Sequence, residues 1–161
     1  MTVIIDGTAG ITFPNSTVQV SAGSVLQVVN ATYSTEVSTS GTTFVTRNLT
    51  ASITPKFAIS KILVIVSLGD VGANNATSRN GASFNLTRNG GQIGANFGSQ
   101  WGLNNGAQFT IISGGFSYLD SPATTSSTAY LVNFKCHDSG RTVYCFRDNT
   151  QGSITLMEIA Q

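Results

Sequence analysis

The residues that could carry out acid, base or nucleophilic chemistry are few in this chain and stand apart from one another. The single histidine, His137, lies between Cys136 and Asp138 in a stretch with β-strand character. Neighbouring side chains on a strand point to opposite faces, so Cys136 and His137 are not placed to share a proton. The sequence therefore predicts no catalytic pair, and we expect a protein that is not an enzyme. The seven carboxylates are scattered singly: Asp6, Glu36, Asp70, Asp120, Asp138, Asp148 and Glu158.

Metal, cofactor and nucleic-acid chemistry are not indicated either. The sequence has no group of histidines or cysteines at zinc-ligand spacing and no acid-rich calcium loop. We expect no metal and no cofactor. Eight Lys and Arg residues nearly balance seven Asp and Glu residues, for a net charge of +1. Without a basic stripe the chain has no phosphate-binding surface, which argues against nucleic acid as a partner.

The two cysteines fall on the arms of an expected hairpin around "SGR" at 139–141. If Gly140 and Arg141 form its two-residue loop, Cys136 and Cys145 face each other. If Ser139 and Gly140 form it, the cysteines are diagonal neighbours roughly 7 Å apart, too far for an unstrained disulfide. A chain made in a reducing cytoplasm keeps its thiols free. A Cys136–Cys145 disulfide is therefore not favoured over two free, buried thiols.

Binding, rather than catalysis, is the chemistry that the expected loops offer. Trp101 is the sole tryptophan, and Asn104 and Asn105 follow it closely. A sugar can stack its apolar face on an aromatic ring while its hydroxyls bond to neighbouring amides. The alternative for Trp101 is a structural role, at one end of the fold or between subunits. The full set of candidate receptor-binding residues is Trp101, Asn104, Asn105, Tyr118, Asp70, Asn74 and Arg79.

The composition fits one uncharged, well-packed domain with a short extension. Charged residues make up 9% of the chain, against about 25% in an average soluble domain. Hydrophobic residues reach 40%, too many for a disordered chain. Surfaces rich in Ser, Thr, Asn and Gly are typical of extracellular or virion-surface β proteins. The first residues lack the basic start of a signal peptide, and the longest apolar run, 62–66, is too short for membrane insertion.

Short β-rich runs alternate with turn signals, and helical periodicity is absent. The run "SKILVIVSL" is apolar nearly throughout and predicts a central strand covered on both faces. The last run, "SITLMEIA", has apolar residues on both faces, so we expect it to lie between the core and a partner, such as another subunit. The expected strands are 24–32, 42–53, 60–68, 82–88, 92–96, 108–118, 127–137, 142–147 and 153–160.

The strand spacing predicts an all-β fold, a jelly-roll-like antiparallel β-sandwich over residues 24–161, with a closed barrel as the alternative. Asn89-Gly90 is a strong signal for a type I′ hairpin. The polar segments 69–81 and 98–107 are expected to be long surface loops.

Residues 1–23 form a unit of their own. In "GITFPNSTVQVSAG", Ile11, Phe13, Val18 and Val20 alternate with polar or small residues around a Pro-Asn turn signal. The pattern predicts two very short strands with a tight corner between them. A lone two-stranded ribbon is marginal in water, so these strands need a partner, either other copies of the chain or the edge of their own sandwich.

"GITFPNSTVQVSAG" resembles the "GI-T/S-FPDGTVQ-TA" stretch that closes the shaft of many bacteriophage tail-fibre proteins, just before their C-terminal head. The following "VLQVV" and "SKILV" strands, and the final "ITLMEIAQ", are similar to parts of such a head. Together these stretches span about half the chain. One departure is Asn15-Ser16 where the fibres carry Asp-Gly, which keeps a turn-forming residue but changes the turn type. A second is that no long shaft or anchoring domain precedes the motif.

The resemblance implies a homotrimer with a C1q- or TNF-like head, whose N-terminal strands (Ile11, Phe13, Val18, Val20) wind together or dock to another virion protein. It implies a short tail fibre whose head binds a host-surface glycan or protein, in a virion released by lysis. Alternatives are a capsid-decorating, head-fibre or baseplate protein of a phage, or a jelly-roll domain of non-viral origin.

Overall fold

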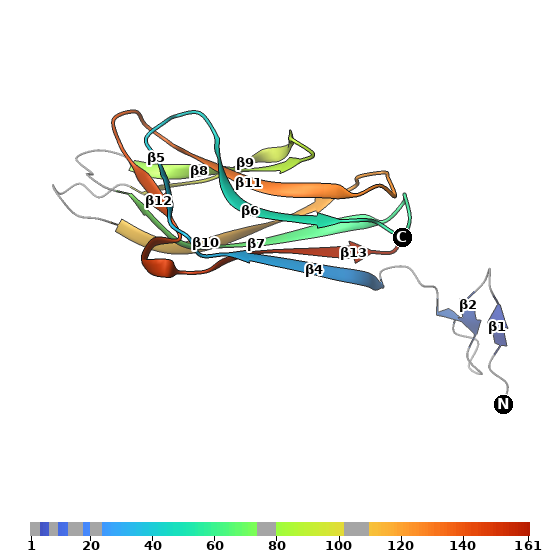
Figure 1. Ribbon diagram of the computed structural model, residues 1–161. Coiled ribbons are helices and arrows are strands. Elements are labelled where there is room, and N and C mark those ends of the chain that lie inside the picture. Colours follow the sequence, from blue (N-terminus) through green and yellow to red (C-terminus); the bar gives the residue numbers. More distant parts are fainter. Residues whose placement is uncertain (1–3, 7–9, 13–17, 20–23, 74–79, 102–109) are drawn as a thin grey trace.

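The structure is a computed structural model of the 161-residue chain, and it describes residues 4–6, 10–12, 18–19, 24–73, 80–101 and 110–161. Side chains are described for residues 24–73, 81–97 and 113–161. Two stacked antiparallel sheets form the sandwich (Figure 1). The prediction of an all-β sandwich is therefore confirmed. Within the described residues, no helix has the length and apolar character needed to cross a lipid bilayer.

The first sheet holds four long strands in the spatial order β4, β13, β7, β10. The second sheet has the order β6, β11, β8, β9. Two short strands, β12 and β5, extend the first sheet beside β7. The bounds are β4 Val25–Tyr33, β5 Val37–Thr39, β6 Val45–Ile53, β7 Lys61–Ala73, β8 Asn80–Arg88, β9 Gly91–Trp101, β10 Thr110–Asp120, β11 Thr128–Cys136, β12 Val143–Cys145 and β13 Gly152–Ile159.

The pairing of the eight long strands defines the topology. In chain order, the first pairs with the eighth (β4 with β13) and the second with the seventh (β6 with β11). The third pairs with the sixth (β7 with β10), and the fourth with the fifth (β8 with β9). This pairing of the first strand with the eighth, the second with the seventh, and so on inward defines a jelly roll, which arranges its eight strands in two packed sheets.

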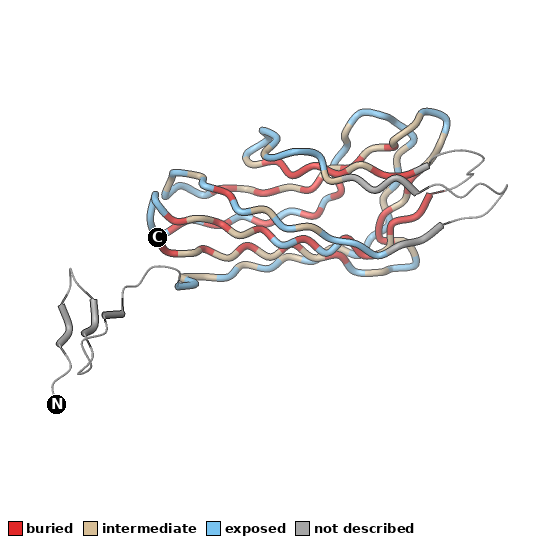
Figure 2. The backbone as a smooth tube through the Cα atoms, turned by 180° about the vertical axis from the view of Figure 1, so that it is seen from behind, coloured by how far each residue is buried: buried red, intermediate tan, exposed pale blue. Residues whose placement is uncertain are grey.

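The core lies between the two sheets and follows the strand period of two. On β7, Ile62, Val64 and Val66 point inward and are buried. On β11, Tyr130, Val132 and Phe134 meet them from the opposite sheet, each with no exposed surface. Figure 2 shows this alternation of buried and partly exposed residues along the strands.

Within the single chain, the run 60–68 is covered on one face only, so the chain's own sheets do not supply the two-sided covering that the sequence predicts. The strand is central, since it pairs with β13 on one side and β10 on the other. However, its outward side chains alternate with the buried ones, and Ile65 is 41% exposed. The nearly continuous apolar run reflects an outer sheet face that is itself apolar.

The predicted hairpin that would carry Cys136 and Cys145 on its two arms is wrong. Cys136 ends β11 in the second sheet, whereas Cys145 ends β12 in the first sheet, beside β7. Residues 137–142 therefore cross from one sheet to the other. Both thiols are free and buried.

β12 and β13 lie along the same edge of β7 but are separated by an irregular segment, 146–151, opposite Leu68–Asp70. The segment contains a short 3₁₀ turn, Arg147–Asn149, and three residues with positive φ: Phe146, Asp148 and Asn149. This geometry turns the Phe146 ring into the core, where the ring is fully buried.

Arg47 fills the space beside Phe146. Its guanidinium lies 4.3 Å from the centroid of the Phe146 ring and 5.1 Å from that of Phe84. Its Nη2 donates a 2.5 Å hydrogen bond to the carbonyl of Leu68, while Nε and Nη1 have no hydrogen-bond partner among the described residues. Burial lowers the pKa of Arg47 to about 10, so the group stays charged at neutral pH.

The N-terminal residues form a separate three-stranded sheet of β1 (Ile4–Asp6), β2 (Gly10–Thr12) and β3 (Val18–Gln19). Ile11 pairs with Gln19, and Thr12 with Val18, as the two predicted short strands require. A third strand, β1, adds to them. Phe13 and Val20 lie outside the described residues. None of the three strands belongs to either sheet of the sandwich.

Candidate functional site

The two ends of the sandwich differ in what they carry. At one end, Ala73 pairs with Thr110 and Asn80 pairs with Trp101. The segments 74–79 and 102–109 connect these strand ends and lie outside the described residues. We call this the distal end, because β4 starts at the opposite, proximal end, where the backbone N–H of Ala160 donates to the carbonyl of Ser24 (Figure 1).

The predicted loops are shorter than expected. β7 continues through Gly69 to Ala73, because Val71–Ala73 pair with both β12 and β10 and are buried. Gly69, with φ of +60°, bends the strand without ending it. β9 likewise continues to Trp101 by pairing with β8. Polar and glycine-rich composition misled the prediction, since the end of β7 is held by strand neighbours on both sides and the end of β9 is held by β8.

Two of the predicted receptor-binding residues, Trp101 and Asp70, lie in strands that lead to the distal end. Trp101 ends β9 at the distal end, although its side chain lies outside the described residues. Asp70 lies three positions from the end of β7 and is half-buried. Its backbone N–H donates to the Thr150 hydroxyl oxygen (3.0 Å), and its carbonyl accepts from the Phe146 N–H (2.8 Å). Asn74, Arg79, Asn104 and Asn105 fall outside the described residues.

Tyr118 is not at the distal end. It pairs with Val64, in the proximal half of β7, and points inward against the core. A Cβ atom on Gly94 would lie 2.7 Å from the Tyr118 ring, so the absence of a side chain at Gly94 makes room for the tyrosine. Next to it, the Phe97 and Phe116 rings stack with centroids 4.0 Å apart. This aromatic group joins β9 to β10.

Residues 137–142 also lie at the distal end. Nδ1 of His137 is 3.1 Å from a carboxylate oxygen of Asp138, and both side chains are partly exposed. The Cys136 sulfur lies 3.3 Å from the carbonyl oxygen of Thr39 and 3.4 Å from that of Arg141, and its single S–H can donate to either. Burial raises the pKa of Cys136, so the thiol is not an activated nucleophile. Among the described residues, no three His, Cys, Asp or Glu side chains could hold a metal ion.

Asp120, a carboxylate that a catalytic site could use, instead joins the two sheets. The Tyr130 hydroxyl donates to it at 2.6 Å, and Arg88 contacts both of its oxygens at 2.9 Å. Burial, followed by the bond to Asp120, raises the pKa of Tyr130. The network holds β8, β10 and β11 together, which is a structural role.

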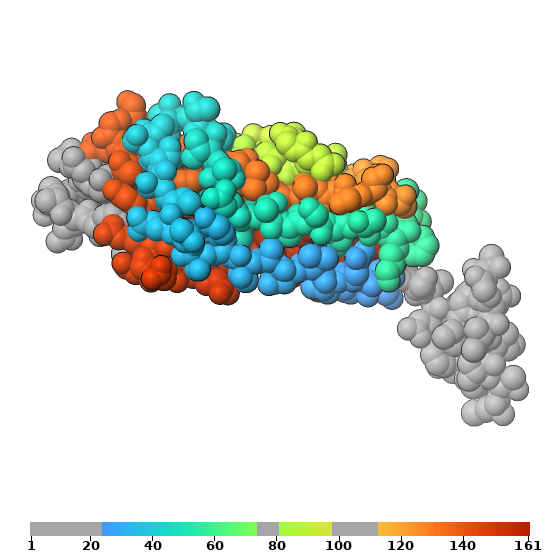
Figure 3. All heavy atoms as spheres, in the orientation of Figure 1, coloured from blue at the N-terminus to red at the C-terminus, as the bar shows by residue number. Residues whose placement is uncertain are grey.

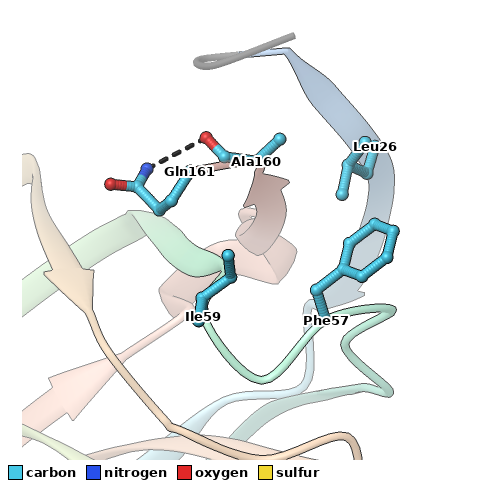
Figure 4. A pocket seen from close by; sticks show the side chains of 5 residues that line it. All are labelled: Leu26, Phe57, Ile59, Ala160 and Gln161. Carbon is cyan, nitrogen blue, oxygen red and sulfur yellow. Dashed lines mark hydrogen bonds between the residues drawn. The ribbon is translucent and has the colours of Figure 1, made fainter. Parts of the chain in front are cut away.

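Sequence reasoning missed the proximal end. A pocket with a volume of about 380 Å³ is lined by Leu26, Phe57, Ile59, Ala160 and Gln161 (Figure 4). Phe57 is 55% exposed and Ile59 is 70% exposed. Both lie in the segment 54–60 between β6 and β7. The run "KFAIS" contains two large apolar residues, and this was the available signal.

A buried carboxylate fixes the segment that carries Phe57 and Ile59. Glu158 accepts hydrogen bonds from the Lys56 N–H (2.7 Å), the Phe57 N–H (3.3 Å) and the Gln27 amide (2.6 Å). The Gln27 amide also donates to the Thr54 carbonyl at 2.7 Å. Burial by itself raises the pKa of Glu158, but these hydrogen bonds outweigh burial and lower it.

No protein-family model and no curated protein matches this chain. Among solved structures, the chain is similar to a chain in the structure of infectious bursal disease virus, Gx strain, with 15% identity and a TM-score of 0.42 over 83% of this chain. It is also similar to dimeric latent PorU from Porphyromonas gingivalis, with 11% identity and a TM-score of 0.39 over 86% of this chain. The chain spans 32% of the viral chain and 13% of PorU. Likenesses this low carry no argument about function.

Proposed function

We propose that this chain is a virion structural protein, the head of a short bacteriophage tail fibre that binds a host cell-surface receptor. In this proposal the protein is a homotrimer without enzymatic activity. The residues quoted above for their resemblance to tail fibres support it, and so does the jelly-roll sandwich. Jelly rolls occur in viral capsid and lectin domains, although a fold alone does not determine function.

The observation that carries the proposal is that the chain enters the sandwich at one end, whereas the strands that lead into the predicted receptor-binding segments end at the other. The chain enters the sandwich at Ser24, and the C-terminal strand ends beside it. The strand ends that lead into 74–79 and 102–109 lie at the far end (Figure 1). A fibre head attached through its N-terminal residues would present this distal end to the cell. Four of the seven predicted receptor-binding residues belong to those two segments, and Trp101 adjoins one of them.

The receptor in this proposal is a neutral surface glycan or protein patch. The surface has few charges, so recognition would rest on hydrogen bonds and aromatic stacking. Weak individual sites are sufficient, because three heads on one fibre, and several fibres on one particle, act together. Figure 3 shows the sandwich as an elongated body, with the start of β4 in blue at one end.

The experiment compares Trp101→Ala with Phe57→Ala. Both substitutions remove an aromatic ring, but Phe57 lies at the proximal end. We expect Trp101→Ala to weaken attachment of the labelled protein to host bacteria by about tenfold or more, as loss of one central contact does. Phe57→Ala should leave attachment unchanged, and both variants should keep the wild-type assembly state by light scattering.

Two results would count against the proposal. Equal attachment by Trp101→Ala and wild-type protein would remove Trp101 from the receptor site. Release of sugar from host surface polysaccharide by the purified chain would contradict the absence of enzymatic activity.

A further inference from the structure

One outer face of the sandwich carries a row of apolar side chains across four strands. Val28 of β4 pairs with Met157 of β13, and Met157 pairs with Leu63 of β7. Leu63 in turn pairs with Leu119 of β10. Paired residues point to the same side of a sheet. The neighbouring residues Ile62, Leu156 and Asp120 are buried, so this row points outward.

The row is exposed in the single chain. Val28 is 55% exposed, Leu119 is 51% exposed and Ile65, in the adjacent row, is 41% exposed. These are three of the seven large hydrophobic residues that are exposed among the described ones, and a fourth, Val25, pairs with Ile159 at the edge of the face. Figure 1 shows no described element over this side of β4, β13, β7 and β10.

The opposite outer face has a different character. There, amides bond to one another across three strands: Asn133 donates to Asn85 (3.0 Å), and Asn85 donates to Gln92 (2.9 Å). Gln92 then donates to Asn96 at 3.0 Å. The amide side chains of this polar face hydrogen-bond to one another, and such a surface is compatible with contact to water. The contrast indicates that the apolar face is the one covered in the assembled protein.

The charge of the apolar face indicates what covers it. Its other outward residues are small or polar and uncharged, such as Asn30, Thr155 and Ser117, and Asn30 donates to the Thr155 hydroxyl oxygen at 2.8 Å. Among the described residues in the half of the face that holds this row, Lys61, next to Ile159, is the charged one. Asp70, which pairs with Ser113 toward the distal end of β7, is half-buried. With so few charges, the face has no preference for a charged partner. It can meet its own copy without like-charge repulsion or unpaired buried ions.

The area of the face is also close to what an interface between two protein chains requires. Four strands about 4.8 Å apart and about eight residues long cover roughly 500 Å² in projection. A standard protein interface buries about 800 Å² of accessible surface on each partner. The face therefore supplies the larger part of one side of such an interface.

We propose that the outer face of β4, β13, β7 and β10 packs against a second copy of this chain, with Val28, Met157, Leu63 and Leu119 at the centre of the contact. The proposal rests on the homotrimer of the proposed function and adds the surface that forms it. Cyclic symmetry then turns the three faces toward a common axis. The amide-lined sheet remains outside, and the distal end stays free for a receptor.

The test uses the full 161-residue chain and two matched substitutions. Val28→Asp places a charge at the centre of the apolar face. Val45→Asp is the control, because Val45 is a valine at a similar exposure, 40%, on a strand of the opposite sheet. Sedimentation velocity over a concentration series should show an assembled wild type and an assembled Val45→Asp. For Val28→Asp we expect the dissociation constant to rise roughly 30-fold or more.

A second measurement reads the face directly. The chain has two methionines, Met1 and Met157, so peptide mapping by mass spectrometry distinguishes oxidation of Met157 by dilute peroxide from oxidation of Met1. Met157 should oxidise more slowly in the assembled wild type than in dissociated Val28→Asp, at equal protein concentration. Circular dichroism of each variant identifies a substitution that has simply unfolded the chain.

The outcomes separate this inference from the proposed function. A monomeric wild type at micromolar concentration would overturn the interface, and so would an assembled wild type whose Met157 oxidises as fast as in the dissociated variant. Assembly of Val28→Asp equal to that of Val45→Asp would place the contact elsewhere and also overturn it. Failure to bind host cells with assembly intact would contradict the receptor function alone.

Discussion

Glu158 is the residue whose charge does most to shape the proximal end. It is fully buried, yet its carboxylate accepts three hydrogen bonds from Gln27 and from the backbone of Lys56 and Phe57. A buried carboxylate is stable only when its oxygens are satisfied in this way. Because these bonds are stronger to the ionised carboxylate, we expect Glu158 to hold segment 54–60 less firmly at acidic pH.

We therefore predict that Glu158→Gln destabilises the protein at neutral pH and weakens its response to acid. The lowered pKa means that the charged group contributes stability above its unfolded value of 4.5, and that this contribution is lost as pH falls through the folded value. Loss of charged hydrogen bonds should cost about 1–3 kcal/mol at pH 7. Urea unfolding at pH 7 and pH 3 measures the effect.

The matched control is Glu36→Gln, since Glu36 is exposed between β4 and β5. This variant should unfold as the wild type does at both pH values. If Glu158→Gln lost as much stability between pH 7 and pH 3 as the wild type, the acid response would have to come from another group.

At the level of elements, the irregular segment between β12 and β13 organises the middle of the core. It leaves the Leu68 carbonyl without a strand partner on that side, and Arg47 donates to this carbonyl. Phe146 packs on Arg47 and meets Tyr33 edge-on at 5.3 Å. Stacking of a planar guanidinium on an aromatic ring compensates in part for burying a cation without a carboxylate.

Gly152 is required for this arrangement. A Cβ atom there would overlap the Phe146 ring and lie 3.0 Å from the Ser67 carbonyl oxygen. We predict that Gly152→Ala destabilises the protein by about 1–3 kcal/mol, the usual effect of overpacking. Gly91→Ala is the control, because its Cβ would lie at an ordinary 3.6 Å from the Arg88 carbonyl. Thermal unfolding of both variants tests this, and equal melting temperatures would contradict it.

Strand positions could be predicted from the sequence far better than strand partners. The short β-rich run "SITLMEIA" located β13, and Asn89-Gly90 located the β8–β9 turn, where Asn89 has a φ of 48°. β5 was missed because three residues carry no periodicity. The false Cys136–Cys145 hairpin arose because a local turn signal does not reveal that 137–142 crosses between sheets. Strand pairing is non-local, so turn residues alone could not determine it.

The candidate site was predictable only in part. Composition marked the regions near Trp101 and Asp70 as exposed and polar, and both lie toward the distal end. Tyr118 also has polar neighbours in the sequence, but it pairs with Val64 in the proximal half of β7 and packs against Gly94. The apolar outer face was indicated by the two-sided pattern of the last strand. Its extent became visible only once Val28, Leu63 and Leu119 were aligned in one row.

For the whole molecule, the proposed function and the proposed interface together give each surface a separate role. The N-terminal sheet would attach the protein, the apolar face would join copies, the amide-lined face would meet solvent and the distal end would meet the host cell. This division depends on the protein being a fibre head rather than a coat component. A capsid-decorating or baseplate protein could use the same trimer with its distal end facing away from any receptor.

The most direct measurement is immunogold electron microscopy of the intact virus particle with antibodies against residues 24–161. We expect label at the tail tip or along lateral tail fibres. Label spread over the capsid would contradict this expectation, and would mean that the trimer decorates the shell and that the distal end has no receptor to bind.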